Sequence, residues 1–164
     1  MTRTHPAHPV DASLANAAIF QSLALDDIAL IRGCAHEDHF TAGTPIVCEG
    51  DPDRRFYVIL HGEATVITHG RSAIHLTSGD HFGEIAALGG TTRTATIIAE
   101  TDVHLLSISH FNLKALLREQ PEIALGVIQG LCSIVRDGYS EHGPLAAEAE
   151  NWVSAFPAPT APNR

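Results

Sequence analysis

The segment that decides the fold is FGEIAALGGTTRTA, residues 82–95. Gly83 has no Cβ, so the backbone at this position can approach a ligand closely. Residues 84–88 can form a single helical turn, whose free N–H groups offer a site for an anion. Arg93 follows at the start of the next expected strand and can add a charge-assisted hydrogen bond to the same anion. The segment therefore predicts a phosphate-binding loop.

Glu84 adds a second requirement to this loop. A carboxylate does not suit an isolated phosphate, because like charges repel. It does suit a ligand that also carries a hydroxyl donor, such as a ribose. Two structural interpretations stay open beside this one. Glu84 could be a solvated glutamate favoured by the helix dipole, and Arg93 could pair with Glu84 when no ligand is bound.

Short segments rich in Val, Ile, Thr and aromatic residues surround the loop and alternate with glycine-centred turns. Their even spacing predicts a mainly β fold, an antiparallel β-roll of the jelly-roll type with flanking helices. Residues 56–67 are expected to form a hairpin that turns at Gly62 and Glu63. The expected strands cover residues 39–40, 46–48, 56–60, 64–68, 73–76, 94–99 and 104–109.

Helices are expected on both sides of the roll. Apolar positions between Ser13 and Cys34 indicate two short helices, with Asp26 as the N-cap of the second. After the roll, residues 111–118 and 121–137 show helical spacing. Gly126 and Gly130, four residues apart on the last helix, would let another backbone approach it closely.

The chain is expected to hold one domain, because its 164 residues are too few for two. Residues 1–12 are expected to be a flexible arm, residues 13–140 the domain, and residues 141–164 a partly disordered tail rich in Ala and Pro. Within that tail, residues 145–152 could form one short helix.

Charge and cysteine content exclude several classes of protein. The 10 basic and 19 acidic side chains give a net charge of −9, which disfavours binding to nucleic acid. Cys34, Cys48 and Cys132 show no CxxC spacing and indicate reduced thiols, with Cys48 expected to be buried packing in a strand. No apolar run is long enough to span a bilayer. We therefore expect a cytoplasmic protein with no membrane partner.

Residues 82–95 resemble the phosphate-binding cassette of the cyclic nucleotide-binding domain family, found in catabolite activators and in regulatory subunits of protein kinase A. The family pattern is commonly written F-G-E-x-[AS]-L…R-[TSA]-A. The flanks agree with it: GTPIVCEGD, residues 43–51, is similar to the family's G-x-x-I-x-x-x-G-[ED] turn, and FYVILHG, residues 56–62, resembles its Y-V-I-x-x-G segment. One departure is Thr92, at a position that is often proline in the family.

The resemblance implies the role of each site residue. Glu84 would accept a hydrogen bond from the ribose 2′-hydroxyl, and Arg93 would pair with a phosphate oxygen. Thr94 would contact the phosphate or a guanine base. The family's base-capping group cannot be aligned here, and Arg136 and Tyr139 are the candidates for it. The full set of expected ligand-binding residues is Phe82, Gly83, Glu84, Ile85, Ala86, Arg93, Thr94 and Ala95.

Other chemistries find less support in the sequence. A metal site of the cupin type needs a His-x-His segment, and none occurs among the 11 histidines, so no metal is expected. His5, His8, His36 and His39 are interpreted as surface imidazoles. No Gly-x-Ser-x-Gly segment is present either.

The function predicted is that of a non-enzymatic sensor of cAMP, or of cGMP, in signal transduction. The ligand would move the C-terminal helices, which an effector protein or a second copy of the chain would then bind. About two dozen residues follow Gly138, and they are proline-rich and without basic character, so no DNA-binding module is expected. Two alternatives are a cupin-like metal enzyme on the same roll and a scaffold module that no longer responds to a ligand.

Overall fold

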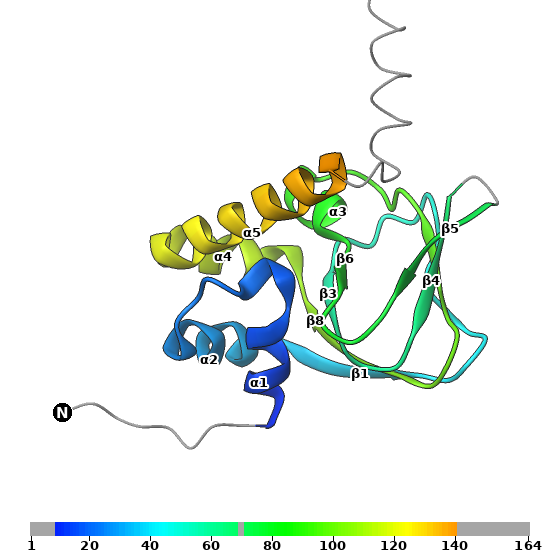
Figure 1. Cartoon of the computed structure of the whole chain (residues 1–164), viewed down its shortest axis with the longest axis horizontal. Helices are drawn as coiled ribbons and strands as arrows, with labels where there is room; N and C mark the ends of the chain where they lie inside the picture. Colours follow the sequence, from blue (N-terminus) through cyan, green and yellow to red (C-terminus); the bar gives the residue numbers. More distant parts are fainter. Residues whose placement is uncertain (1–8, 69–70, 141–164) are drawn as a thin grey trace, which may run out of the picture.

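The computed structural model describes residues 9–68 and 71–140, apart from the side chains of residues 71–73, 133, 134 and 136–140. The first eight residues of the predicted arm and the whole predicted tail, residues 141–164, lie outside the described residues. Two four-stranded antiparallel sheets form the predicted roll, and a layer of helices lies beside it (Figure 1). In chain order the elements are α1 (Pro9–Asn16), η1 (Ala18–Phe20), α2 (Leu25–Gly33), β1 (His36–Phe40), β2 (Pro45–Val47), β3 (Phe56–His61), β4 (Ala64–Thr68), β5 (Arg71–Leu76), β6 (His81–Phe82), α3 (Glu84–Gly89), β7 (Thr96–Ala99), β8 (Val103–Ile108), α4 (His110–Glu119) and α5 (Pro121–Ser140).

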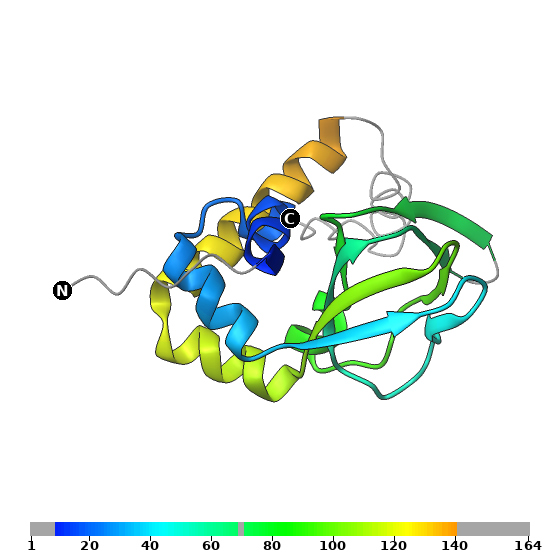
Figure 2. The ribbon, with the colours of Figure 1, turned by 90° about the horizontal axis from the view of Figure 1, so that it is seen from below.

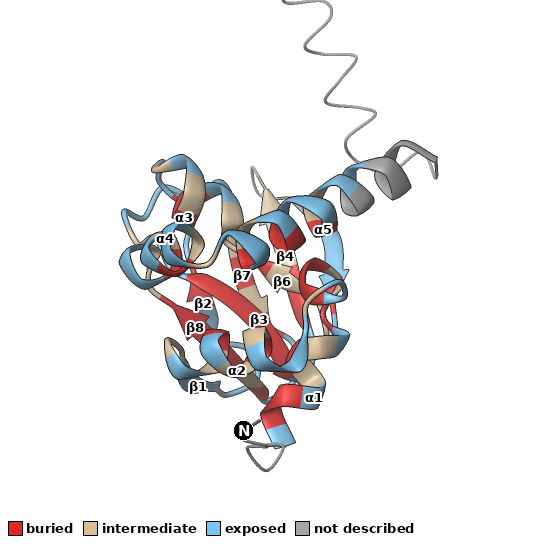
Figure 3. Ribbon diagram, turned by 90° about the vertical axis from the view of Figure 1, so that its left-hand side faces the viewer, coloured by how far each residue is buried: buried red, intermediate tan, exposed pale blue. Residues whose placement is uncertain are grey.

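The two sheets enclose one core, and the helices cover a second. The first sheet has the strand order β1-β8-β3-β6 and the second has the order β2-β7-β4-β5. Ile59, Leu105 and Ile97 lie inside the roll, between the sheets. Val58 and Leu106 are the chain neighbours of Ile59 and Leu105, so they point to the other face of the first sheet, where the helices bury them. Figure 3 shows this face, with buried β3 and β8 beneath the helices.

The N-terminal helices differ from the prediction in their limits. Helix α1 begins at Pro9, inside the range expected to be a flexible arm, because Val10 enters the helical core and Asp11 binds Arg32 Nε at 2.6 Å. Asp26 is not an N-cap: helix α2 begins at Leu25, its N-cap is Ala24, and Asp26 lies in the first turn. An acidic residue there still favours the helix through its dipole.

The predicted hairpin between residues 56 and 67 is wrong. Strand β3 pairs with β8 and β6, whereas β4 pairs with β5 and β7, so the chain crosses from one sheet to the other at Gly62. Gly62 has a φ of 94°, and a Cβ there would collide with the backbone of Asp102. A second error concerns Cys48, which follows the end of β2 and is exposed.

Both C-terminal helices form where they were expected. Ser109 caps α4 by accepting a hydrogen bond from the N–H of Asn112 at 3.2 Å. The close backbone approach predicted for α5 is confirmed, and the approaching segment is η1. A Cβ on Gly130 would lie 2.6 Å from the carbonyl oxygen of Ile19, and one on Gly126 would overlap the side chain of Leu23. Helix α5 therefore packs directly on the N-terminal helical segment (Figure 2).

The structure bears on the prediction that no segment spans a membrane. Among the described helices, none combines the length and the apolar character that crossing a bilayer requires.

Candidate functional site

The candidate site begins at Gly83, where β6 ends and α3 starts. Gly83 is the N-cap of α3 and has a φ of 85°, a left-handed conformation that side chains other than glycine rarely adopt. A Cβ on Gly83 would overlap Arg93 Nη1 and lie 2.5 Å from the carbonyl oxygen of Arg55. Glycine is therefore required twice at this position, by the backbone conformation and by the guanidinium group packed against it.

Helix α3 is the short helix predicted for residues 84–88. Ala86 and Ala87 are buried and fix it to the body of the domain, next to β3 and α4. The N–H of Ala87 donates to the carbonyl of Gly83 at 2.9 Å, and Gly90 closes the helix in a second left-handed conformation. The first amides of a helix have no acceptor within it, so the start of α3 presents N–H donors beside Gly83.

Arg93 is buried at the centre of the site, with only 3% of its side chain exposed. Its backbone is fixed to the turn before β3: the N–H of Arg93 donates to the carbonyl of Asp51 at 2.9 Å, and the N–H of Gly50 donates to the carbonyl of Arg93 at 2.8 Å. Its Nη2 donates to Asp53 Oδ2 at 2.6 Å. Its Nε and Nη1 are buried without a hydrogen-bond partner among the described residues. A buried guanidinium that uses one of its three nitrogens has donors left for an anion.

Asp53 and Tyr57 complete the surroundings of this arginine. The Arg93 guanidinium lies 5.3 Å from the centre of the Tyr57 ring, and the Tyr57 hydroxyl donates to Asp53 Oδ2 at 3.3 Å. Partial burial alone would raise the pKa of Asp53, but the hydrogen bond and the charge of Arg93 outweigh it and lower that pKa. Burial, together with the charge of Asp53, raises the pKa of Tyr57 to about 12. Asp53 is therefore an anion and Tyr57 a neutral donor at neutral pH.

The carboxylate that binds Arg93 is not the one considered from the sequence. In the described part of the chain, Arg93 forms its ion pair with Asp53 and not with Glu84. Glu84 is half-buried at the start of α3, near enough to His81 for its charge to act on that imidazole. Burial lowers the pKa of His81, against the opposite influence of Glu84 and Asp80.

The other predicted site residues lie on either side of this centre. Phe82 is buried and stacks on Tyr57, with ring centres 4.8 Å apart. Ile85 and Thr94 are exposed, and Ala95 is half-buried. Arg136 and Tyr139, the candidates for the base cap, are on helix α5, but their side chains lie outside the described residues. Neither Asp53 nor Tyr57 was predicted to be a site residue, although Tyr57 lies within the segment 56–62 that was matched to the family and Asp53 lies between the two matched segments.

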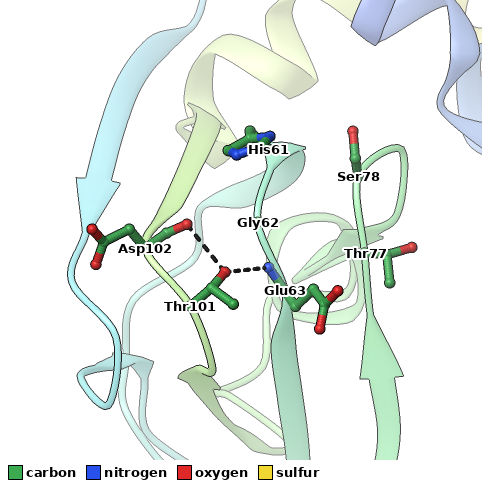
Figure 4. A pocket seen from close by; sticks show the side chains of 7 residues that line it. All are labelled: His61, Gly62, Glu63, Thr77, Ser78, Thr101 and Asp102. Carbon is green, nitrogen blue, oxygen red and sulfur yellow. Dashed lines mark hydrogen bonds between the residues drawn. The ribbon is translucent and has the colours of Figure 1, made fainter.

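A separate hollow of about 520 Å³ lies where the chain crosses between the sheets. Figure 4 shows the residues that line it, most of which have polar side chains and none of which belongs to the segment 82–95. Thr101 Oγ1 accepts from the N–H of Glu63 at 3.0 Å and donates to the carbonyl of Asp102 at 3.2 Å. These hydrogen bonds stabilise the crossover at Gly62, and we interpret the hollow as a structural feature of this crossover.

The fold is a β-roll. Its site combines a short helix that begins directly after a glycine with a buried arginine that has donors free for a ligand. The family model of the cyclic nucleotide-binding domain matches residues 37–120, slightly more than half of the chain. The chain belongs to this family, as its resemblance at residues 82–95 implied.

Known relatives agree with this assignment. The cAMP-dependent protein kinase regulatory subunit of Eremothecium gossypii is 32% identical over 114 residues, which are 69% of this chain and 25% of that protein. The potassium/sodium hyperpolarization-activated cyclic nucleotide-gated channel 2 of Mus musculus is 38% identical over 82 residues, 50% of this chain and 10% of that protein. The catabolite activator protein of Thermus thermophilus superimposes with a TM-score of 0.67 at 26% identity, covering 76% of this chain and 61% of the other. The chain thus spans a quarter or less of the length of these two curated relatives.

Proposed function

We propose that this protein is a non-enzymatic sensor of a cyclic purine nucleotide, with cAMP favoured over cGMP. The phosphate would bind Arg93 and the backbone N–H groups of Gly83, Glu84 and Ala86. The Glu84 carboxylate would accept from the ribose 2′-hydroxyl. Phe82, Ile85, Thr94 and Ala95 would complete the surface around the ligand.

One observation carries this proposal: two buried nitrogens of Arg93 have no hydrogen-bond partner in the described part of the chain, while the third donates to Asp53. Leaving buried donors unsatisfied costs about 1–3 kcal/mol each. A phosphate between Arg93 and the start of α3 would satisfy them with charge-assisted bonds. Gly83 brings the backbone against the same guanidinium, so the two elements that would bind the phosphate are adjacent.

The preference for cAMP rests on the relatives, several of which are named as cAMP-dependent regulatory subunits. Thr94 is exposed next to Arg93 and would also permit a contact with guanine. Either Arg136 or Tyr139, on α5, would cap the base.

The output we propose is a rearrangement of the C-terminal helices. Helix α3 contacts α4, and α4 contacts α5, so the ligand-binding turn is joined to the last helix by direct packing. An effector protein, or a second copy of the chain, would bind the altered helices. The net charge of −9 disfavours DNA as that partner, and we expect the protein to act in the cytoplasm without a membrane partner.

Calorimetric titration with cAMP and with cGMP tests the ligand. We expect binding to the chain, with cAMP the tighter ligand, and a loss of about ten-fold or more in Arg93→Lys, because lysine cannot reproduce the planar guanidinium. Arg118→Lys is the matched control, since Arg118 is exposed in the last turn of α4 and should leave affinity unchanged. No binding of either nucleotide at several hundred micromolar would overturn the proposal.

Thermal melting separates the sensor from a scaffold that no longer responds. A ligand that binds only the folded state raises the melting temperature by mass action. We expect this rise with cAMP, and its loss in Arg93→Lys. Identical melting with and without both nucleotides would instead identify a scaffold module.

A further inference from the structure

On the first sheet, Glu37 and His39 of strand β1 come together with His104 of strand β8, which is far from them in sequence. The antiparallel register places His39 directly opposite His104. Their rings stack with centres 4.2 Å apart and planes inclined by 14°. Glu37 lies two residues before His39, on the same face of β1, and its Oε2 is 2.8 Å from His104 Nε2.

This cluster faces outward and remains open to solvent. Val103 and Leu105, the neighbours of His104, point into the roll, so His104 points to the opposite face. Farther along the same strand, Leu106 is covered by the helices, whereas His104 retains 27% exposure and Glu37 retains 45%. Strand β1 runs from the helices toward the far end of the roll, as Figure 2 shows, and His39 lies near the end of this strand.

We infer that Glu37, His39 and His104 form a binding site for one divalent transition-metal ion of the zinc type. One ligand atom from each side chain lies within 4.8 Å of the other two. Around a tetrahedral zinc with ligand distances near 2.1 Å, ligand atoms are about 3.4 Å apart. A metal lies in the plane of each imidazole that binds it, so the stacked rings would have to rotate out of their parallel arrangement to close the site, and the metal would replace the hydrogen bond between Glu37 and His104. Three protein ligands leave a fourth position for water.

The inference does not depend on nucleotide binding. Strand β1 is one edge of the sheet, and β6, which leads into Gly83, is the other edge. Three strand spacings of about 4.8 Å separate these edges. A bound ion would join the edge strand β1 to β8, and it would lie outside the roll.

Titration of the whole chain with ZnCl2 in a buffer that does not chelate, followed by calorimetry, tests the site. We expect the wild type to bind one ion per chain. The affinity for zinc should fall about ten-fold or more, relative to the wild type, in each of His104→Ala, His39→Ala and Glu37→Gln. His36→Ala is the matched control: His36 is exposed on the same strand, but it is three residues from His39 and so points to the opposite face. Circular dichroism should be unchanged in all four variants, because the side chains are at the surface.

Further outcomes decide the inference. Equal zinc affinity in the wild type and in the His39→Ala/His104→Ala double variant would overturn it, and so would the absence of binding at about 100 µM zinc. Sedimentation with one equivalent of zinc should give the same mass as without metal. A zinc-dependent dimer would mean that the ligands come from two molecules, which contradicts a site within one chain. Saturating cAMP should leave the zinc isotherm unchanged, so a failure of the nucleotide proposal would be recognised separately.

Discussion

Substituting alanine for the glycines at the ends of α3 tests how Arg93 is held. Gly83 and Gly90 flank the helix and share a left-handed backbone, with φ of 85° and 75°. They differ in their surroundings: a Cβ on Gly83 would overlap Arg93 Nη1, whereas one on Gly90 would meet nothing within 4 Å. Gly89 has neither constraint. The three variants thus separate backbone conformation from contact with the guanidinium.

The magnitudes follow from these differences. Gly89→Ala should be neutral or stabilise by up to about 1 kcal/mol, because alanine favours a helix. Gly90→Ala should destabilise by about 1–2 kcal/mol, the cost of a side chain in the left-handed region. Gly83→Ala carries the same cost and about 1–3 kcal/mol more for overpacking against Arg93. It should also weaken cAMP binding by about ten- to one-hundred-fold, the loss of one charge-assisted hydrogen bond.

Urea unfolding followed by circular dichroism measures the free energies of unfolding, and calorimetry measures the affinity. Only variants with unchanged m-values should be compared, because the comparison assumes the same two states. If Gly83→Ala is no less stable than Gly90→Ala, Arg93 does not pack against Gly83 as the structure has it. If Gly90→Ala weakens cAMP binding as much as Gly83→Ala, contact with the guanidinium is not the cause.

Three further substitutions have definite expected results. Asp53→Asn should destabilise the ligand-free protein by about 1–2 kcal/mol, a value reduced by solvent screening because Asp53 is partly exposed. Since the folded-state pKa of Asp53 is lowered, this stabilisation is present above about pH 4 and is lost as the pH falls through the folded value, so unfolding curves of the variant and the wild type should converge in acid. Gly130→Ala should destabilise by about 1–3 kcal/mol in urea unfolding, because the methyl group would meet the backbone of Ile19, and a stability equal to that of the wild type would contradict this contact. Ser109→Ala should cost about 1 kcal/mol in the same assay through loss of the α4 cap, and no change would argue against the cap.

Local signals were enough to predict most of the elements. The glycine-centred turns marked where strands end, and the start of α5 at Pro121 followed from the preference of proline for the first helical position. The helical turn after Gly83 was predicted because a glycine that frees the backbone precedes good helix formers. The base-capping candidates Arg136 and Tyr139 remain predictions.

Features that depend on distant pairing were missed. Strand-like segments rich in apolar residues on both sides of Gly62 look the same whether the strands pair with each other or pass into different sheets, so the hairpin prediction failed. Asp53 is 40 residues from Arg93, and no local pattern reveals that this carboxylate binds the guanidinium. His39 meets His104 only through the β1–β8 register, whereas along the chain its apparent partner was His36.

The contact between Gly130 and Ile19 has a mechanical consequence for α5. Side-chain ridges normally lock two helices against both turning and sliding. Here the backbones touch directly, so sliding by one residue would press Gln129 or Leu131 onto Ile19. Gly130 is near the middle of α5, with arms of about 14 Å on each side. Helix α5 is thus fixed against sliding at Gly130, while the buried side chains of Ile123 and Val127 anchor the half of the helix that precedes this contact.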